Sequence, residues 1–282
     1  MSNSTKYPES VEAYIHKYNL NQLIDFNSDY SERFDLKQTG VLPPDPSNAS
    51  PYTPDWFDLV RLHQIVLKRK ITTILEFGVG YSTIVLAQAL LENSKKYTTF
   101  VTANLRKDNP FMVFSVDADS DFIDYTQDLL PNDLKAHVFF HHSGVQMTEW
   151  HGRICTLYDQ LPNICPDFIY LDAPEPSQAE GLVRGITTSH PDRLPMSADI
   201  LAIEHFLLPG TIILVDGRTA NARFLQCNLQ RNWEHHHSVN DDVHYFGLKE
   251  QPLGTMNQVE IEWRYGDPYW PQDQSNDFYG LE

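Results

Sequence analysis

The sequence predicts an α/β fold. We expect a doubly wound, mostly parallel, seven-stranded Rossmann-like sheet with an antiparallel C-terminal hairpin and helices on both faces. From residue 71 onward, short and continuously apolar runs alternate with segments of helical periodicity, as in βαβ units whose strands are covered on both sides. Further on, two strand-like segments flank a short polar turn, which is typical of a hairpin.

Each expected element has its own signal. The parallel strands are apolar runs without internal proline or glycine: Ile71–Phe77, Phe111–Val116, Ala136–Phe140, Phe168–Leu171 and Thr211–Val215. Helical spacing of apolar residues marks Trp56–Lys68, Ser82–Leu91, Asp119–Leu130 and Ala198–Leu208. The hairpin strands are Glu234–Val239 and Val243–Leu248, joined by Asn240–Asp242.

Length and composition favour one large domain with extensions, because 282 residues with 41% hydrophobic content can bury a sizeable core. We expect an N-terminal extension at 1–55, the main domain at 56–250 and a C-terminal tail at 251–282. The extension is polar, is broken by Pro43–Pro46, and should form irregular or helical arms. The tail from Gly266 has no periodicity and should be irregular.

Charge and apolar content disfavour several classes of protein. A formal net charge of -17 repels nucleic acids, so we expect no nucleic-acid partner. No apolar run is long enough to span a bilayer, and the polar start Met1–Thr5 lacks a signal-peptide core, so we expect a cytoplasmic protein without a membrane partner. The three cysteines show no CxxC spacing and predict neither disulfides nor a zinc site.

The first strand leads into a glycine bend, within the segment Glu76–Thr83 (EFGVGYST). In an open α/β sheet, ligands bind outside the carboxyl ends of the strands, where strand order reverses. The glycines allow a tight turn, and Ser82 or Thr83 can cap the helix that follows. Free amides there could meet a ligand group, although a lone GxG also fits a simple strand-to-helix turn.

Carboxylates end four of the expected strands. The second strand ends at Asp117, where a doubly wound fold holds the ribose hydroxyls of a nucleoside, while Asp119 fits a helix N-cap. Asp172 and Asp216 follow apolar strand residues and are costly to bury unpaired. With Glu76, they would lie on one edge of the sheet, which favours a functional rim over coincident caps and ion pairs.

Together these segments resemble the motifs of class I S-adenosylmethionine-dependent methyltransferases. Glu76–Gly80 resembles their first motif, Asp117 their ribose-binding acid and Leu171–Asp172 their motif after the fourth strand. The likeness in order and spacing covers about Ile71 to Leu248, and the terminal hairpin separates this family from nicotinamide-binding folds. The segments 76–83 and 170–174 are most similar to the small-molecule O-methyltransferase branch, including macrocin-type enzymes.

The resemblance implies that the cofactor is S-adenosylmethionine and that the bend and the neighbouring strand ends bind it. The residues implied are Glu76, Phe77, Gly78, Gly80, Ser82 and Thr83 around the methionine portion, Asp117 and Ala118 beside the ribose and adenine, and Ser143 and Gly144 on the adenine side.

Asp172 is the best-placed catalytic base, and Asp216 could share the work of accepting a proton. Arg218 could anchor an anionic acceptor or pair with a neighbouring carboxylate. In metal-dependent catechol-type relatives an Asn follows the second of these acids, but Gly217 stands here, so we expect no obligatory metal. His235–His237 cannot converge on one ion, because consecutive strand residues point to opposite faces.

The resulting hypothesis is O- or N-methylation of a small molecule such as a sugar or secondary metabolite, with the long segment Pro174–Ser197 helping to form the acceptor pocket. One alternative is a nicotinamide-dependent oxidoreductase, which is weakened because Thr83 stands where GxGxxG needs a third glycine. Another is a methyltransferase-like binding protein without turnover. Composition does not predict the oligomeric state.

Overall fold

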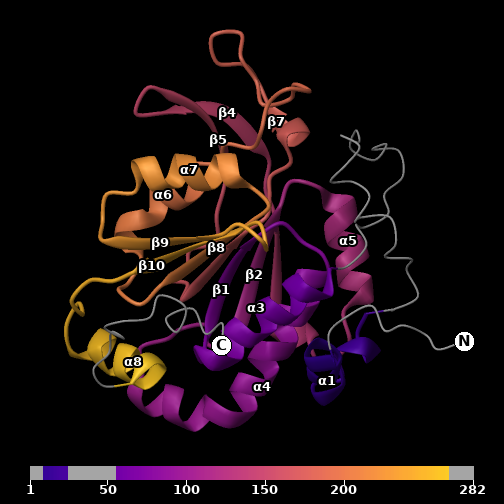
Figure 1. Cartoon of the computed structure of the whole chain (residues 1–282), viewed down its shortest axis with the longest axis vertical. Helices are drawn as coiled ribbons and strands as arrows, with labels where there is room; N and C mark the ends of the chain where they lie inside the picture. Colours follow the sequence, from indigo (N-terminus) through magenta and orange to yellow (C-terminus); the bar gives the residue numbers. More distant parts are fainter. Residues whose placement is uncertain (1–8, 25–54, 267–282) are drawn as a thin grey trace, which may run out of the picture.

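The computed structural model describes residues 9–24 and 55–266 (Figure 1). The break at Pro43–Pro46 and nearly all of the tail expected to be irregular from Gly266 lie outside the described residues. Within the expected N-terminal extension, the described part forms helix α1 (Glu9–Lys17) and a short 3-10 helix, η1 (Leu20–Gln22), whose apolar side chains pack against helix α3 (Trp56–Lys68).

The main sheet has seven strands in the order β3-β2-β1-β6-β8-β10-β9. Five are parallel, and β10 pairs antiparallel with both β8 and β9. Their bounds are Thr73–Phe77 (β1), Met112–Asp117 (β2), Val138–His142 (β3), Phe168–Leu171 (β6), Ile212–Asp216 (β8), Trp233–Ser238 (β9) and Val243–Leu248 (β10). The predicted Rossmann-like sheet with its antiparallel hairpin is confirmed.

Helices cover both faces of this sheet, as the continuously apolar strands predict (Figure 1). One core cluster joins the sheet to α3 and to α4 (Tyr81–Asn104), and the other joins it to α6 (Asp199–Ile203) and α7 (Thr219–Asn228). The side chain of Asp119 caps α5 (Ser120–Leu129) by accepting the N–H of Asp121 at 2.9 Å.

Strand order reverses between β1 and β6, because the chain first moves outward through β2 and β3 and then returns to the other side of β1. In open α/β sheets a ligand crevice forms outside the carboxyl ends of the strands at such a reversal, so the expected crevice lies beside the end of β1. In Figure 1 these ends point towards the small sheet at the top of the molecule.

That small sheet was not predicted. It has the order β5-β4-β7, and its bounds are Val145–Trp150 (β4), Arg153–Tyr158 (β5) and Ala179–Glu180 (β7). The β4–β5 turn is made by His151 and Gly152, both at positive φ. Strand β7 lies within the long segment Pro174–Ser197 and pairs with β4, so this segment is joined to the small sheet, and its part in an acceptor pocket stays a prediction.

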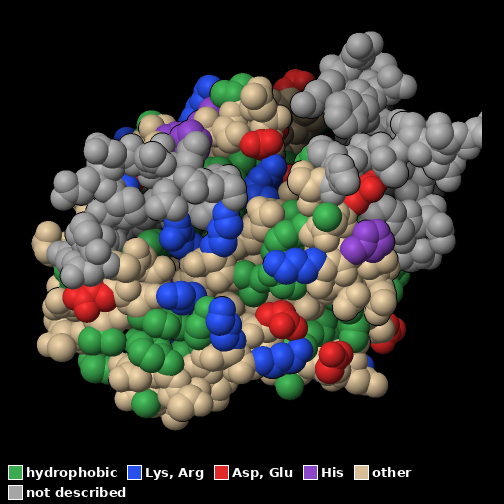
Figure 2. All heavy atoms as spheres, turned by 60° about the horizontal axis from the view of Figure 1, so that its bottom comes forward, with side chains coloured by type: hydrophobic (Ala, Val, Ile, Leu, Met, Phe, Trp, Pro, Cys, Tyr) green, Lys and Arg blue, Asp and Glu red, His purple; other side chains and the backbone are tan. Residues whose placement is uncertain are grey.

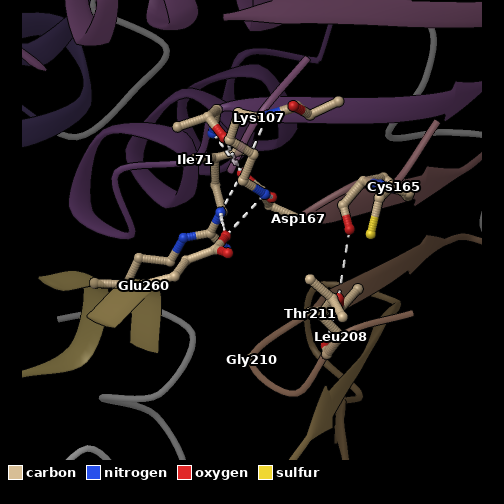
Figure 3. A network of polar contacts seen from close by, with 12 residues as sticks. Ile71, Lys107, Cys165, Asp167, Leu208, Gly210, Thr211 and Glu260 are labelled. Carbon is tan, nitrogen blue, oxygen red and sulfur yellow. Dashed lines mark hydrogen bonds and ion pairs between the residues drawn. The ribbon is translucent and has the colours of Figure 1, made fainter. Parts of the chain in front are cut away.

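The segment expected as a C-terminal tail contains helix α8 (Thr255–Tyr265), which the sequence analysis did not identify. Its Glu260 and Arg264 join Lys107 and Asp167 in a buried ionic network at the amino ends of the strands (Figure 3). Trp263 of α8 stacks on Phe100 of α4, with ring centroids 5.2 Å apart. Helix α8 thus packs on the main domain.

No helix in the described part of the chain is long and apolar enough to cross a membrane.

Candidate functional site

The glycine bend after β1 lies against the loop that follows β6. Gly78 has φ +102°, a conformation that side chains disfavour, and its N–H donates to Val116 at 2.9 Å. A Cβ built on Gly78 would lie 3.2 Å from Cβ of Ala173. Glycine therefore lets the two sides of the strand-order reversal approach one another closely.

Glu76 lies beneath this bend and is fully buried. Its carboxylate accepts hydrogen bonds from Ser82 at 2.6 Å, Thr83 at 2.7 Å and Ser115 at 2.5 Å. Burial raises the pKa of Glu76 to about 7, against the opposing effect of these three hydroxyls. Glu76 therefore ties the first turn of α4 to β1 and β2, and its contact with a cofactor stays a prediction.

Asp117 joins the tip of β2 to the bend. Its Oδ2 accepts the N–H of Val79 at 3.0 Å, and its Oδ1 accepts the N–H of Asp119 at 2.8 Å. Burial raises the pKa of this carboxyl above its ordinary value. Ala118 donates a further backbone hydrogen bond, and since a carboxylate has about four acceptor sites, Asp117 keeps capacity for a hydroxyl group.

The residues predicted on the adenine side assemble next to Asp117. The N–H of Ser143 donates to the carbonyl of Asp117 at 3.0 Å, and its hydroxyl accepts the N–H of Gln160 at 2.9 Å. A Cβ on Gly144 would lie 2.7 Å from Oδ2 of Asp159, so a larger residue would displace that side chain. The carbonyl of Ala118 lies 3.1 Å from Nε2 of His142.

Phe77, directly before the glycine bend, has a structural role in the core. Its ring is fully buried and stacks on Tyr158 of β5, with centroids 5.7 Å apart. Its carbonyl accepts the N–H of Asp172 at 3.0 Å. The side chain of Phe77 thus belongs to the core, and its backbone links the ends of β1 and β6.

Arg218 holds the loop after β6. Its guanidinium donates to the carbonyl oxygens of Asp172 and, at 2.8 Å, of Pro174, and it pairs with Glu175 at 3.0 Å. Its Nε also lies 3.4 Å from the half-exposed carboxylate of Asp172. Of the two roles weighed for Arg218, the structure contains the pairing with neighbouring carboxylates.

Asp216 is the second predicted base. It accepts a hydrogen bond from the Tyr170 hydroxyl at 2.8 Å, and burial together with the charge of Asp172 raises its pKa to about 7. Asp58 of α3 also belongs to this group, since burial and the charge of Asp216 raise its pKa to about 7. The sequence analysis missed Asp58, because helical periodicity does not show which polar residue faces a crevice.

In the two described stretches, no three or more His, Cys, Asp or Glu side chains are arranged to hold a metal ion. His235 and His237 lie on one face of β9 and meet His244 of β10: a nitrogen of His235 is 3.0 Å from one of His244, and the rings of His237 and His244 stack at 3.8 Å. His236 stacks instead with Tyr245 on the other face.

A separate pocket of about 470 Å³ lies at the opposite end of the sheet. Exposed lysines line it at the end of α3 and in α4: Lys68, Lys95 and Lys96. Figure 2 shows lysine and arginine side chains spread over this face, interspersed with acidic and hydrophobic ones.

No family model and no curated protein matches this sequence. Three similar solved structures are O-methyltransferases by name. They are TomG from Streptomyces achromogenes, in complex with SAM (16% identity, 88% of this chain and 93% of that chain, TM-score 0.40), a putative enzyme from Klebsiella pneumoniae (14%, 77% and 95%, 0.41) and one from Bacillus cereus, in complex with SAH (13%, 88% and 94%, 0.39). At such low identity and TM-score, the similarity assigns no activity to this chain.

Proposed function

We propose that this chain transfers a methyl group from S-adenosylmethionine to a small-molecule acceptor. The observation that carries the proposal is the junction of Asp117 with the glycine bend, where strand order reverses in a sheet that ends in an antiparallel pair. A doubly wound fold binds a nucleoside at this place, and the strand-end acid meets the ribose hydroxyls.

The chemistry of the donor set fits this cofactor. Asp117 keeps acceptor capacity beyond its contacts with backbone N–H groups. Nothing in the described part of the chain lies within 4 Å of a Cβ built on Gly80, so the bend is open to close approach at that residue. Asp117 would hold the ribose, Ser143 and Gly144 would border the adenine, and Gly78 and Gly80 would border the methionine portion. When bound, S-adenosylmethionine supplies an electrophilic methyl group on a sulfonium.

The residues of this chain then orient the acceptor and take up its proton. Asp216, with a pKa of about 7, can accept a proton near neutral pH. Asp172 would share this role, because burial raises its pKa to about 6 against the opposing effect of the neighbouring Arg218. Arg218 is engaged by the loop after β6, so it would shape the acceptor pocket instead of binding an anionic acceptor.

Two alternatives remain testable, namely a nicotinamide-dependent oxidoreductase and a binding protein without turnover. The antiparallel pair β10–β9 disfavours the oxidoreductase, because the nicotinamide-binding fold is not expected to end in an antiparallel hairpin. The choice between O- and N-methylation, the macrocin-type branch, the cytoplasmic location and the extension, domain and tail bounds stay predictions from the sequence.

Calorimetry of the full chain with S-adenosylhomocysteine and with NAD tests the proposal. We expect binding of S-adenosylhomocysteine alone, and binding of NAD alone would overturn the assignment in favour of the oxidoreductase. A methyl-release assay over alcohols, phenols, amines and sugars then tests turnover. Cofactor binding without methyl release to any acceptor in this panel would favour the binding protein.

A further inference from the structure

Strand β5 carries two buried hydroxyl groups for which no hydrogen-bond partner exists among the described residues. They belong to Thr156 and Tyr158, which are 2% and 6% exposed and, two residues apart, lie on the same side of the strand. An unpaired buried hydroxyl costs free energy, and native proteins retain few of them. A bound molecule that supplies the missing partner would explain one of them.

The backbone around Tyr158 is firmly held. The buried carboxylate of Asp199 accepts the N–H of Tyr158 at 3.0 Å and the hydroxyl of Ser197 at 2.8 Å. The side-chain amide of Asn221 in turn accepts the N–H of Ser197 at 2.7 Å and donates to the carbonyl of Ser197 at 3.0 Å. The ring of Tyr158 is fixed against Phe77, so the unpaired hydroxyl does not result from a loose segment.

The ring of Tyr158 lies at the carboxyl end of β1, beside the expected ligand site. Its ring stacks on Phe77, the residue directly before Gly78, and thus covers the end of β1. Burial raises the pKa of Tyr158 well above its ordinary value, and among neighbouring charges Asp117 has the largest effect, followed by Asp199. Phe77 pairs with Val116, the residue directly before Asp117, so the ring of Tyr158 lies at the strand end beside the carboxylate that the proposed function assigns to the ribose.

We propose that Tyr158 is a cofactor-binding residue whose hydroxyl hydrogen-bonds the nucleoside part of the cofactor beside Asp117. The inference rests on the proposed function. It gives the unpredicted hairpin β4–β5 a role, since the hairpin delivers Tyr158 to the end of β1. Thr156 lies two residues earlier in the strand, farther from the strand end that meets Phe77, and should not reach the cofactor.

The substitution Tyr158→Phe tests the proposed hydrogen bond, because it removes the hydroxyl oxygen and keeps the ring that stacks on Phe77. Thr156→Val is the matched control, because it removes the other unpaired hydroxyl and keeps the shape of the side chain. Without ligand, both variants should melt at or above the wild-type temperature, because each loses an unsatisfied polar group. Calorimetry would measure the affinity of each chain for S-adenosylhomocysteine and for 5′-methylthioadenosine, which lacks the amino acid portion.

We expect Tyr158→Phe to weaken binding of both ligands by about fivefold to tenfold, the range of one neutral hydrogen bond, and Thr156→Val to leave both affinities unchanged. Equal affinities in Tyr158→Phe and wild type would overturn the inference while leaving the proposed function intact. A loss confined to S-adenosylhomocysteine would overturn the nucleoside assignment. Failure of the wild-type chain to bind either ligand would contradict the proposed function itself.

Discussion

The substitution Asp167→Asn should destabilise the chain by about 3 kcal/mol, because it leaves buried cations without their main partner. Asp167 is 2% exposed, and its Oδ2 accepts the N–H of Thr72 at 2.7 Å while it pairs with Lys107 and Arg264 (Figure 3). The formal charges of Lys107, Arg264, Asp167 and Glu260 cancel, so the variant leaves one uncompensated positive charge.

The geometry places this cost at the lower end of the 3–5 kcal/mol that loss of one partner from a buried pair typically takes. Asparagine can keep its oxygen towards Thr72 and Arg264, but its NH₂ group would then face the ammonium of Lys107. Burial alone would raise the pKa of Asp167, yet Arg264 and Lys107 outweigh it and hold the pKa below its ordinary value. The native chain therefore stabilises the charged form.

Urea unfolding at neutral pH measures the loss, and Glu92→Gln is the matched control. Glu92 pairs with Lys95 at 2.9 Å on the exposed face of α4, and loss of such a pair should cost less than about 0.5 kcal/mol. Hydrogen exchange should also rise in α8, which supplies Glu260 and Arg264 to the network. Equal losses in the two variants, or unchanged exchange in α8, would refute the assignment of the network as the anchor of this helix.

Three further predictions concern the crevice. Asp117→Asn should weaken binding of S-adenosylhomocysteine at least tenfold, as expected for loss of a charged acceptor. The control Asp119→Asn, which alters only the helix cap, should leave the affinity measured by calorimetry within about twofold of wild type. Equal effects of the two substitutions would contradict the assignment of Asp117 to the ribose. Arg218→Lys should lower kcat with little change in cofactor affinity, because a lysine cannot make all the hydrogen bonds of the guanidinium to the loop after β6. Steady-state kinetics measure this effect. A change in the acceptor KM alone would indicate that Arg218 binds the acceptor directly. Stability should fall as pH rises from about 4 to about 7, because four carboxyls with folded pKa values of about 7 stay protonated in the folded chain while the unfolded chain releases its protons (Asp58, Glu76, Asp199 and Asp216). His63 and His244, whose folded pKa values are about 4, act in the opposite direction but are outnumbered by these carboxyls. Urea unfolding at about pH 5 and pH 8 measures the net change, and equal or greater stability at pH 8 would contradict the prediction.

The main sheet could be predicted from the sequence because its strands are buried on both faces, and their apolar runs differ sharply from the polar segments between them. Helix α4 was predicted only for Ser82–Leu91, since its second half carries polar residues that face solvent and has few buried apolar side chains. The hairpin β4–β5 was missed for a related reason. Its strands lie above the sheet edge, half-buried and mixed in polarity, so Val145–Tyr158 contains no clean alternation.

In the candidate site, too, residues marked by local sequence patterns could be predicted, whereas contacts between distant segments could not. The strand-end acids could be located from their place after apolar runs, and Asp119 was correctly expected to cap a helix. The contacts of Arg218 with the loop after β6, and the electrostatic interaction of Asp58 with Asp216, join segments far apart in the chain. Only the packing of α3 and the loop after β6 on the sheet brings these residues together, and the spacing of residues in the sequence does not predict this packing.

The pKa values of buried carboxyls shift in opposite directions at the two ends of the sheet, and this contrast supports placing function at the carboxyl ends. At the amino ends, Asp167 is paired so completely that its pKa falls below its ordinary value, which is the arrangement of a stabilising network. At the carboxyl ends, burial raises the pKa of Glu76, Asp58 and Asp216 to about 7, and the charge of a neighbouring carboxylate adds to this effect in each case. The ion pair of Asp58 with Arg61 opposes the rise without cancelling it. Such carboxylates reduce the stability of the free chain at neutral pH, so selection for folding alone would not favour them. Their cost is accounted for if a ligand binds there and a proton is transferred there.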